Sequence, residues 1–189
     1  KDKPIVWTLH DSWPFCGICH YFYECEAYQQ QCGCCPFLHS NKANDLSYKV
    51  WKKKAESYKD LDLHIVSPSQ WLGNCAKQSG LLGHFPITVI PNCLDVEAYR
   101  PINEMEISPK WRDFQESRLT KPFVLYGAMN AAMDKRKGFA NLLSALHLLE
   151  RQGCGGAFEL IVFGATESEL SMNLKIPVHY VGYVGKTTT

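Results

Sequence analysis

The chain has 189 residues, enough for one large domain or two small ones. Its 20 Lys and Arg nearly balance 19 Asp and Glu, and 46% of its residues are hydrophobic. A net charge of +1 gives no general reason to expect nucleic acid as a partner. No apolar run reaches the about 18 residues that a bilayer crossing needs. No signal peptide is recognisable, and the chain opens directly on a strand-like run, so we expect further sequence before it.

Six short runs of Val, Ile, Leu and aromatic residues predict strands that are buried on both faces, as in parallel sheets. They are Ile5–Leu9, Leu63–Ser67, Ile87–Ile90, Phe123–Tyr126, Glu159–Phe163 and Val178–Val181.

Three helices are predicted between these strands. The first follows an apolar stripe from Leu46 to Tyr58, with lysines on its solvent face. The second covers residues 71–76, with Ser67 or Ser69 as its cap and Pro68 in its first turn. The third covers residues 139–149 and ends near Gly153.

This alternation predicts an α/β fold of βαβ units, with the carboxyl ends of the strands at one edge of each sheet. Residues 94–121 break the alternation with two prolines and mixed charges, which is typical of a linker. We therefore expect two domains, residues 1–93 and 94–189, with a Cys-rich insertion at residues 16–36.

A cluster of cationic side chains before the third predicted helix suggests an anion-binding site. Lys135, Arg136 and Lys137 precede Gly138, and the helix start adds backbone N–H groups and a partial positive charge. These groups could bind a diphosphate. The alternative is a solvated turn whose charges have no ligand.

The first strand ends at His10 and Asp11, followed by Ser12, Trp13 and Pro14. Ligands of open α/β sheets bind beyond such strand ends. An aromatic and polar rim suits a sugar, because Trp stacks on ring faces while Asp and His bind hydroxyls. The alternative for His10 is a core residue with both ring nitrogens satisfied.

Six of the nine cysteines lie between Cys16 and Cys35. Four of them, Cys19, Cys25, Cys32 and Cys35, are spaced C-x5-C-x6-C-x2-C, and the last gap is that of a zinc knuckle. His20 could replace one ligand, and Cys16 and Cys34 are spares. The spacing favours a structural zinc; disulfides and reduced packed thiols remain as alternatives.

Five strings of the sequence, taken in order, resemble glycosyltransferase family 4, and within it the bacterial branch of colanic-acid and exopolysaccharide biosynthesis. They are residues 7–15 (WTLHDSWPF), the cysteine array ending at residues 32–36 (CGCCP), and residues 65–72 (IVSPSQWL), 89–95 (VIPNCLD) and 134–139 (DKRKGF).

This resemblance implies a GT-B fold, in which two Rossmann-like domains face a cleft, and a retaining transfer without a catalytic metal. The donor would be a nucleotide sugar and the acceptor a saccharide or lipid-linked saccharide. It also implies a cytoplasmic enzyme, at the inner face of the membrane through peripheral contacts of regions outside this chain. Both domains would be partial, so we expect the 189-residue chain alone to be inactive.

The resemblance also assigns roles to residues. His10 and Asp11 would lie on the acceptor side near the transferred sugar, while Lys137 would pair with the donor diphosphate and Gly127 would end the donor domain's first strand. No protein base is required, because the leaving phosphate accepts the acceptor's proton in such enzymes.

Three features depart from the family pattern. Ala128 stands where the family commonly has a diphosphate-binding Arg, a charge that Arg136 could replace. Cys93 replaces the usual glycine after Asn92, and the paired-glutamate donor motif does not occur. Two other functions stay open: a nucleotide-sugar epimerase of GT-B fold, and a zinc-binding interaction module on an α/β scaffold.

Overall fold

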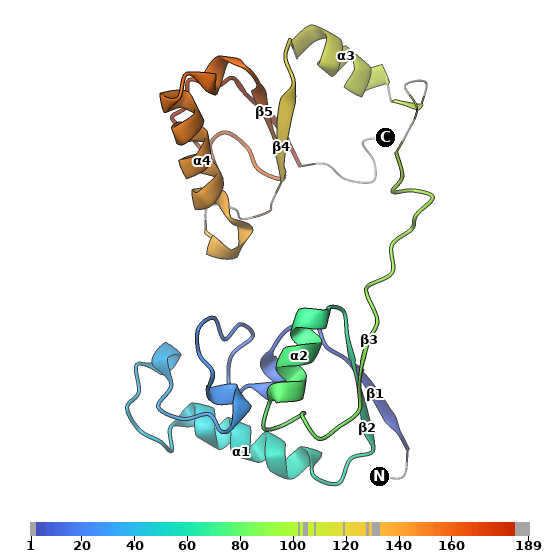
Figure 1. The fold of residues 1–189 in the computed structure, drawn as a ribbon, viewed down its shortest axis with the longest axis vertical. Coiled ribbons are helices and arrows are strands. Elements are labelled where there is room, and N and C mark those ends of the chain that lie inside the picture. The colour runs from blue at the N-terminus through green and yellow to red at the C-terminus, as the bar shows by residue number, and fades with distance from the viewer. Residues whose placement is uncertain are drawn as a thin grey trace. The chain divides into compact units, whose positions relative to one another are not determined.

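The computed structural model describes residues 3–101, 103, 106–107, 109–118, 120–127, 129 and 133–183. The chain forms two compact units, Lys1–Tyr99 and Arg100–Thr189, which divide somewhat after the boundary expected near residue 93. Each unit is a small parallel α/β sheet with its own core, consistent with a Rossmann-like fold (Figure 1).

The first unit contains the sheet β1-β2-β3, made of Ile5–Thr8, Leu63–Ser67 and Ile87–Val89. All its strand pairs are parallel, with Ile5 opposite Leu63 and Ile65 opposite Ile87. Helices α1 (Leu46–Tyr58) and α2 (Gln70–Gln78) make the crossovers.

Local sequence explains where these two helices begin. The Asp45 carboxylate accepts the Tyr48 amide and caps α1, and the Ser69 hydroxyl caps α2 by accepting the Leu72 amide. Pro68 therefore precedes the cap of α2, and the prediction that it occupies the first turn is wrong.

The second unit contains the parallel sheet β4-β5-β6, made of Phe123–Gly127, Glu159–Phe163 and Val178–Gly182. Helix α4 (Phe139–Arg151) joins β4 to β5 and lies beside this sheet (Figure 1). Leu146 of α4 packs with Leu160 and Val162 of β5 in the core.

Helix α3 (Pro109–Arg118) lies within the stretch that the sequence predicted as a linker. That prediction is wrong for these residues. The proline stands at the first position of the helix, where its missing N–H costs nothing. The rings of Trp111 and Phe114 stack at 5.1 Å, and Phe114 meets the ring of His179 of β6 edge-on.

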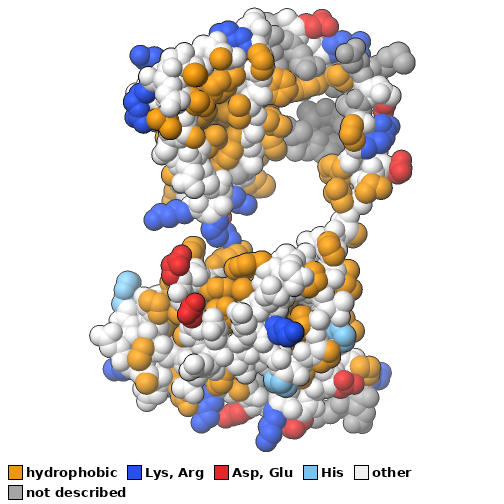
Figure 2. Space-filling view, viewed as in Figure 1, with side chains coloured by type: hydrophobic (Ala, Val, Ile, Leu, Met, Phe, Trp, Pro, Cys, Tyr) orange, Lys and Arg blue, Asp and Glu red, His pale blue; other side chains and the backbone are white. Residues whose placement is uncertain are grey.

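The expectation of strands buried on both faces holds for most of β5 but not for β2, whose His64 is exposed. Leu63, Ile65 and Leu160 are buried, whereas Val6 of β1 and Leu125 of β4 are 68% and 56% exposed. His64 is the register partner of Val6, so these two side chains share one exposed face of the first sheet, whereas β4 is an edge strand of the second sheet. Apolar side chains accordingly reach the surface of each unit (Figure 2).

Between β1 and α1 the chain runs through three single-turn 3₁₀ helices, Trp13–Phe15, Ala27–Gln29 and Pro36–Leu38, without a strand. Phe15, Cys16 and Tyr28 of this Cys-rich segment are buried in the core of the first unit. The segment is therefore part of the domain's core. Within the described parts of the chain, no helix is long and apolar enough to cross a membrane.

Candidate functional site

The carboxyl end of β1 presents His10 and Asp11. The amide of Leu9 donates to the carbonyl of Val66 at 2.8 Å, which extends the β1–β2 pairing one residue beyond Thr8. His10 and Asp11 are thus the first residues beyond the sheet. His10 is exposed, so the alternative of a buried core histidine is wrong.

Asp11 is hydrogen-bonded within the protein. Its Oδ2 lies 2.7 Å from Nδ1 of His20, and its Oδ1 accepts the amide of Trp13 at 2.8 Å. Partial burial alone would raise the pKa of Asp11, but the hydrogen bonds from His20 and Trp13 lower it below the usual value. Asp11 is therefore ionised and paired with His20.

Trp13 contacts a buried lysine. The ammonium of Lys54, from α1, lies 3.6 Å from the centroid of the Trp13 indole ring and donates to the carbonyls of Trp13, Cys16 and Gly17. Burial lowers the pKa of Lys54 to about 8. One face of the indole is covered by Lys54, which leaves at most the other face for stacking on a sugar.

The lysines Lys49, Lys52, Lys53 and Lys59 are exposed, as the helical stripe predicted. Lys54, only 7% exposed, lies instead on the apolar face of α1. The helical pattern did not identify it.

The four predicted zinc ligands are free thiols that influence one another. Burial, together with the nearby thiols of Cys35, Cys32 and Cys25, raises the pKa of Cys19 to about 11. The sulfur of Cys32 also accepts the amide of Gly17 at 3.1 Å. The four cysteines thus share one neighbourhood in the fold.

This neighbourhood is not a formed metal site. The residues described include no group of three or more His, Cys, Asp or Glu side chains arranged to hold a metal ion. Raised pKa values keep the thiols of buried Cys16 and partly buried Cys19 protonated near neutral pH.

At the carboxyl end of β4, Gly127 lies against the ring of Phe163. A Cβ added to Gly127 would overlap that ring, so only glycine fits without moving Phe163. Packing against Phe163 is therefore enough to explain why residue 127 is a glycine. Ala128, the expected departure from the family pattern, lies outside the described residues.

The cation cluster forms a single-turn 3₁₀ helix, Lys135–Lys137, capped by Asp134. The Asp134 carboxylate accepts hydrogen bonds from Nε of Arg136 at 2.9 Å and from its Nη2 at 2.6 Å. This pairing lowers the pKa of Asp134. Arg136 is therefore engaged with a carboxylate in this structure.

Lys137 is exposed, and its carbonyl accepts the Tyr126 hydroxyl at 3.2 Å, which ties the loop to the end of β4. Gly138 follows with φ 70°, and α4 then begins without a side-chain cap. The first turn of α4 therefore keeps backbone N–H groups that no side chain caps, next to Lys137.

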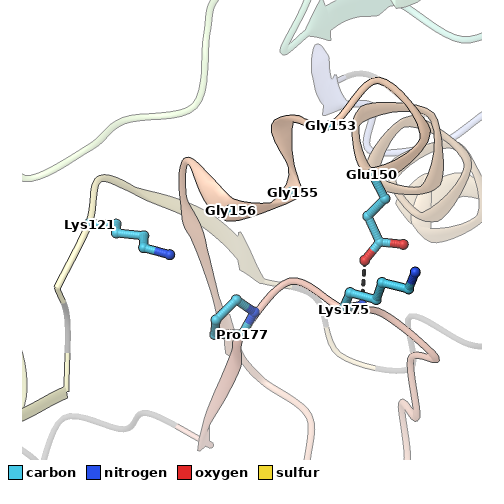
Figure 3. A pocket seen from close by; sticks show the side chains of 7 residues that line it. All are labelled: Lys121, Glu150, Gly153, Gly155, Gly156, Lys175 and Pro177. Atoms are coloured by element: carbon cyan, nitrogen blue, oxygen red, sulfur yellow. Dashed lines mark hydrogen bonds between the residues drawn. The ribbon is translucent and has the colours of Figure 1, made fainter.

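A pocket of about 300 Å³ in this unit lies elsewhere (Figure 3). Its lining residues Lys121, Gly156 and Pro177 precede β4, β5 and β6, which places it at the amino edge of the sheet. The carboxylate of Glu150 points into this region and accepts the amides of Lys175 and Ile176. Ligands of such sheets bind at the opposite edge, so this pocket lies away from the edge where a ligand is expected.

No protein-family model and no solved structure matches the chain. The chain is 27% identical over 120 residues to the presumed colanic acid biosynthesis glycosyl transferase WcaC of Escherichia coli (strain K12). The match covers 58% of this chain and 29% of that protein, so the chain spans less than a third of the length of this relative. The similarity is distant and supports a glycosyltransferase.

Proposed function

We propose that this chain belongs to a retaining glycosyltransferase of the GT-B type, which moves a sugar from a nucleotide-sugar donor to a saccharide or lipid-linked saccharide in surface polysaccharide biosynthesis. The observation that carries this proposal is the start of α4, where Lys137 is exposed beside a helix terminus without a side-chain cap. The similarity to WcaC supports the same reaction class.

The proposed catalysis depends on the negative charge that develops on the leaving diphosphate. When the bond between sugar and diphosphate breaks, negative charge grows on the leaving phosphate. A fixed cation and the partial positive charge of a helix start stabilise that state more than the ground state. Lys137 would supply the cation and Gly138 close backbone approach. Arg136 would contribute only after leaving Asp134, and Gly127 would shape the strand end.

In this reaction the leaving phosphate accepts the proton of the acceptor hydroxyl. His10 and Asp11 then need no role as a base. We propose that they belong to the acceptor side, where exposed His10 binds substrate hydroxyls. The protein would act in the cytoplasm, at the inner face of the membrane.

The test uses the complete enzyme with radiolabelled UDP-glucose, UDP-galactose and GDP-mannose, and lipid-linked saccharides extracted from the source organism. We expect transfer from one donor only when acceptor is present, with retained anomeric configuration in the product. Formation of an epimer without acceptor would identify an epimerase instead. No turnover of any donor would contradict the proposal.

We also propose a structural zinc on Cys19, Cys25, Cys32 and Cys35. Support comes from their spacing and from their shared neighbourhood. Zinc would favour the thiolate form and draw the four sulfurs together. In the structure the side chains are not closed around a common point, so metal content needs direct measurement.

A further inference from the structure

The Cys-rich segment brings one residue back to the end of β1. The carbonyl of His20 accepts two hydrogen bonds from Ser12, from the amide at 3.0 Å and from the hydroxyl at 2.7 Å. Ser12 is only 3% exposed. The backbone of His20 is therefore anchored beside Asp11.

The imidazole of His20 is oriented as well. Its Nδ1 lies 2.7 Å from Oδ2 of Asp11. An ionised carboxylate only accepts hydrogen bonds, so Nδ1 carries the hydrogen and Nε2 is the atom left to bind a ligand. The His20 side chain is 63% exposed, which keeps the ring accessible.

The carboxylate of Asp11 is itself held in place by the neighbouring backbone. The other oxygen of Asp11 accepts the Trp13 amide, and Lys54 binds the carbonyl of the same Trp13. Two bonded oxygens leave Asp11 little freedom to rotate. The carboxylate is held in place before any ligand arrives.

Stability does not account for this arrangement, since an exposed ion pair contributes little to it. The location of the His20–Asp11 pair explains it better. The pair lies beyond the carboxyl end of a parallel strand, where α/β sheets bind ligands, and sugar sites fix hydroxyls with a few placed polar groups.

We propose that His20, oriented by Asp11, binds a hydroxyl of the saccharide acceptor through Nε2. This inference rests on the proposed function. Asp11 is then a positioning residue that acts through His20, and the Cys-rich segment supplies part of the acceptor site. The sequence had suggested His20 only as a substitute zinc ligand.

The test measures transfer by the complete enzyme, with the donor that proves active and the extracted lipid-linked saccharides as acceptor. We expect H20A to raise the acceptor KM about tenfold or more while the donor KM stays unchanged. H20Q, whose amide can occupy the Nε2 position, should recover part of the loss. Exposed His84, away from the β1 end, provides the matched control H84A, which should behave as wild type.

The double variant D11A/H20A separates positioning from general structure. If Asp11 acts only through His20, the double variant should be no worse than H20A alone. If the losses caused by the two single substitutions multiply in D11A/H20A, Asp11 does not act only through His20. A normal acceptor KM in H20A would overturn the whole inference.

A structural effect is checked by thermal unfolding, and H20F supplies a ring of similar size without Nε2 if H20A fails to fold. Should H20F then show a normal acceptor KM, the inference is wrong. If the wild-type enzyme transfers no sugar from any donor, the proposed function itself fails, which is a distinct result.

Discussion

The ammonium of Lys54 lies 3.6 Å from the centroid of the Trp13 ring and donates to the carbonyl of the same residue. It also binds the carbonyls of Cys16 and Gly17, so a single side chain of α1 fastens the turn that follows the end of β1. The turn after β1 and the start of the Cys-rich segment are thus held by one buried cation.

Replacing Lys54 by Met should destabilise the protein. The change leaves buried carbonyls without a donor, at a cost of about 2–3 kcal/mol. Urea unfolding of the complete protein measures this loss. The neighbouring exposed Lys53 is the matched control, and K53M should stay within about 0.5 kcal/mol of wild type. Equal effects of both substitutions would show that the buried contacts add nothing.

Asp45 should make stability depend on pH under acid conditions. Hydrogen bonds from Ser47 and from the Cys35 and Tyr48 amides lower its pKa below the usual 3.8. A carboxylate with a lowered folded pKa stabilises the protein fully above the unfolded value. That contribution disappears as the pH falls below 3.8 toward the folded pKa.

The measurement is the urea midpoint between neutral pH and acid for wild type, D45N and the exposed control D60N. Asn can still cap a helix, but it does not titrate. The midpoint of D45N should therefore fall less steeply with acid than that of wild type, whereas D60N should follow wild type. Parallel curves for D45N and wild type would count against this role.

Lys137 should matter for turnover more than its neighbours in the loop. Losing a group that stabilises transition-state charge costs about 100-fold or more in kcat. K137A in the complete enzyme should show such a loss, while K135A, which removes another exposed lysine of the same turn, should show a small one. Similar losses for the two variants would indicate diffuse charge effects and contradict a specific diphosphate contact.

Gly127 should be sensitive to a single methyl group. G127A would push the new Cβ into the outer end of the Phe163 ring, which is 37% exposed and can turn aside, so we expect a cost of about 0.5–1.5 kcal/mol. Truncating the ring in G127A/F163A should remove the clash. The double variant should then be no less stable than F163A alone, as measured by urea unfolding. An added loss from G127A in the F163A background would point to another constraint on this glycine.

Zinc should copurify with the protein at one ion per chain. C32S or C35S should lower the zinc content, whereas C154S, which changes an exposed cysteine of the other unit, should leave it unchanged. Cobalt substitution should give the absorption of a tetrathiolate site. A zinc-free protein with a mass lower by two hydrogens per bridge would indicate disulfides, and one of unchanged mass would indicate reduced thiols.

The amino-acid sequence by itself determined the elements with strong local signals. The run Glu159–Phe163 forms β5 as predicted, and the apolar spacing of α4 places that helix within a few residues of its observed bounds. These elements follow from side-chain periodicity, which is a property of neighbours along the chain. The carboxyl-end rule likewise placed His10 and Asp11 just beyond β1.

Only the tertiary structure decided which side chains meet. The pairing of His20 with Asp11 and the burial of Lys54 depend on how loops and helices return in space. The exposure of β1 and β4 depends on which faces and edges of the sheets other elements cover. Such contacts are made between residues whose local sequence is compatible with many other neighbours, and for this reason periodicity and spacing could not select them.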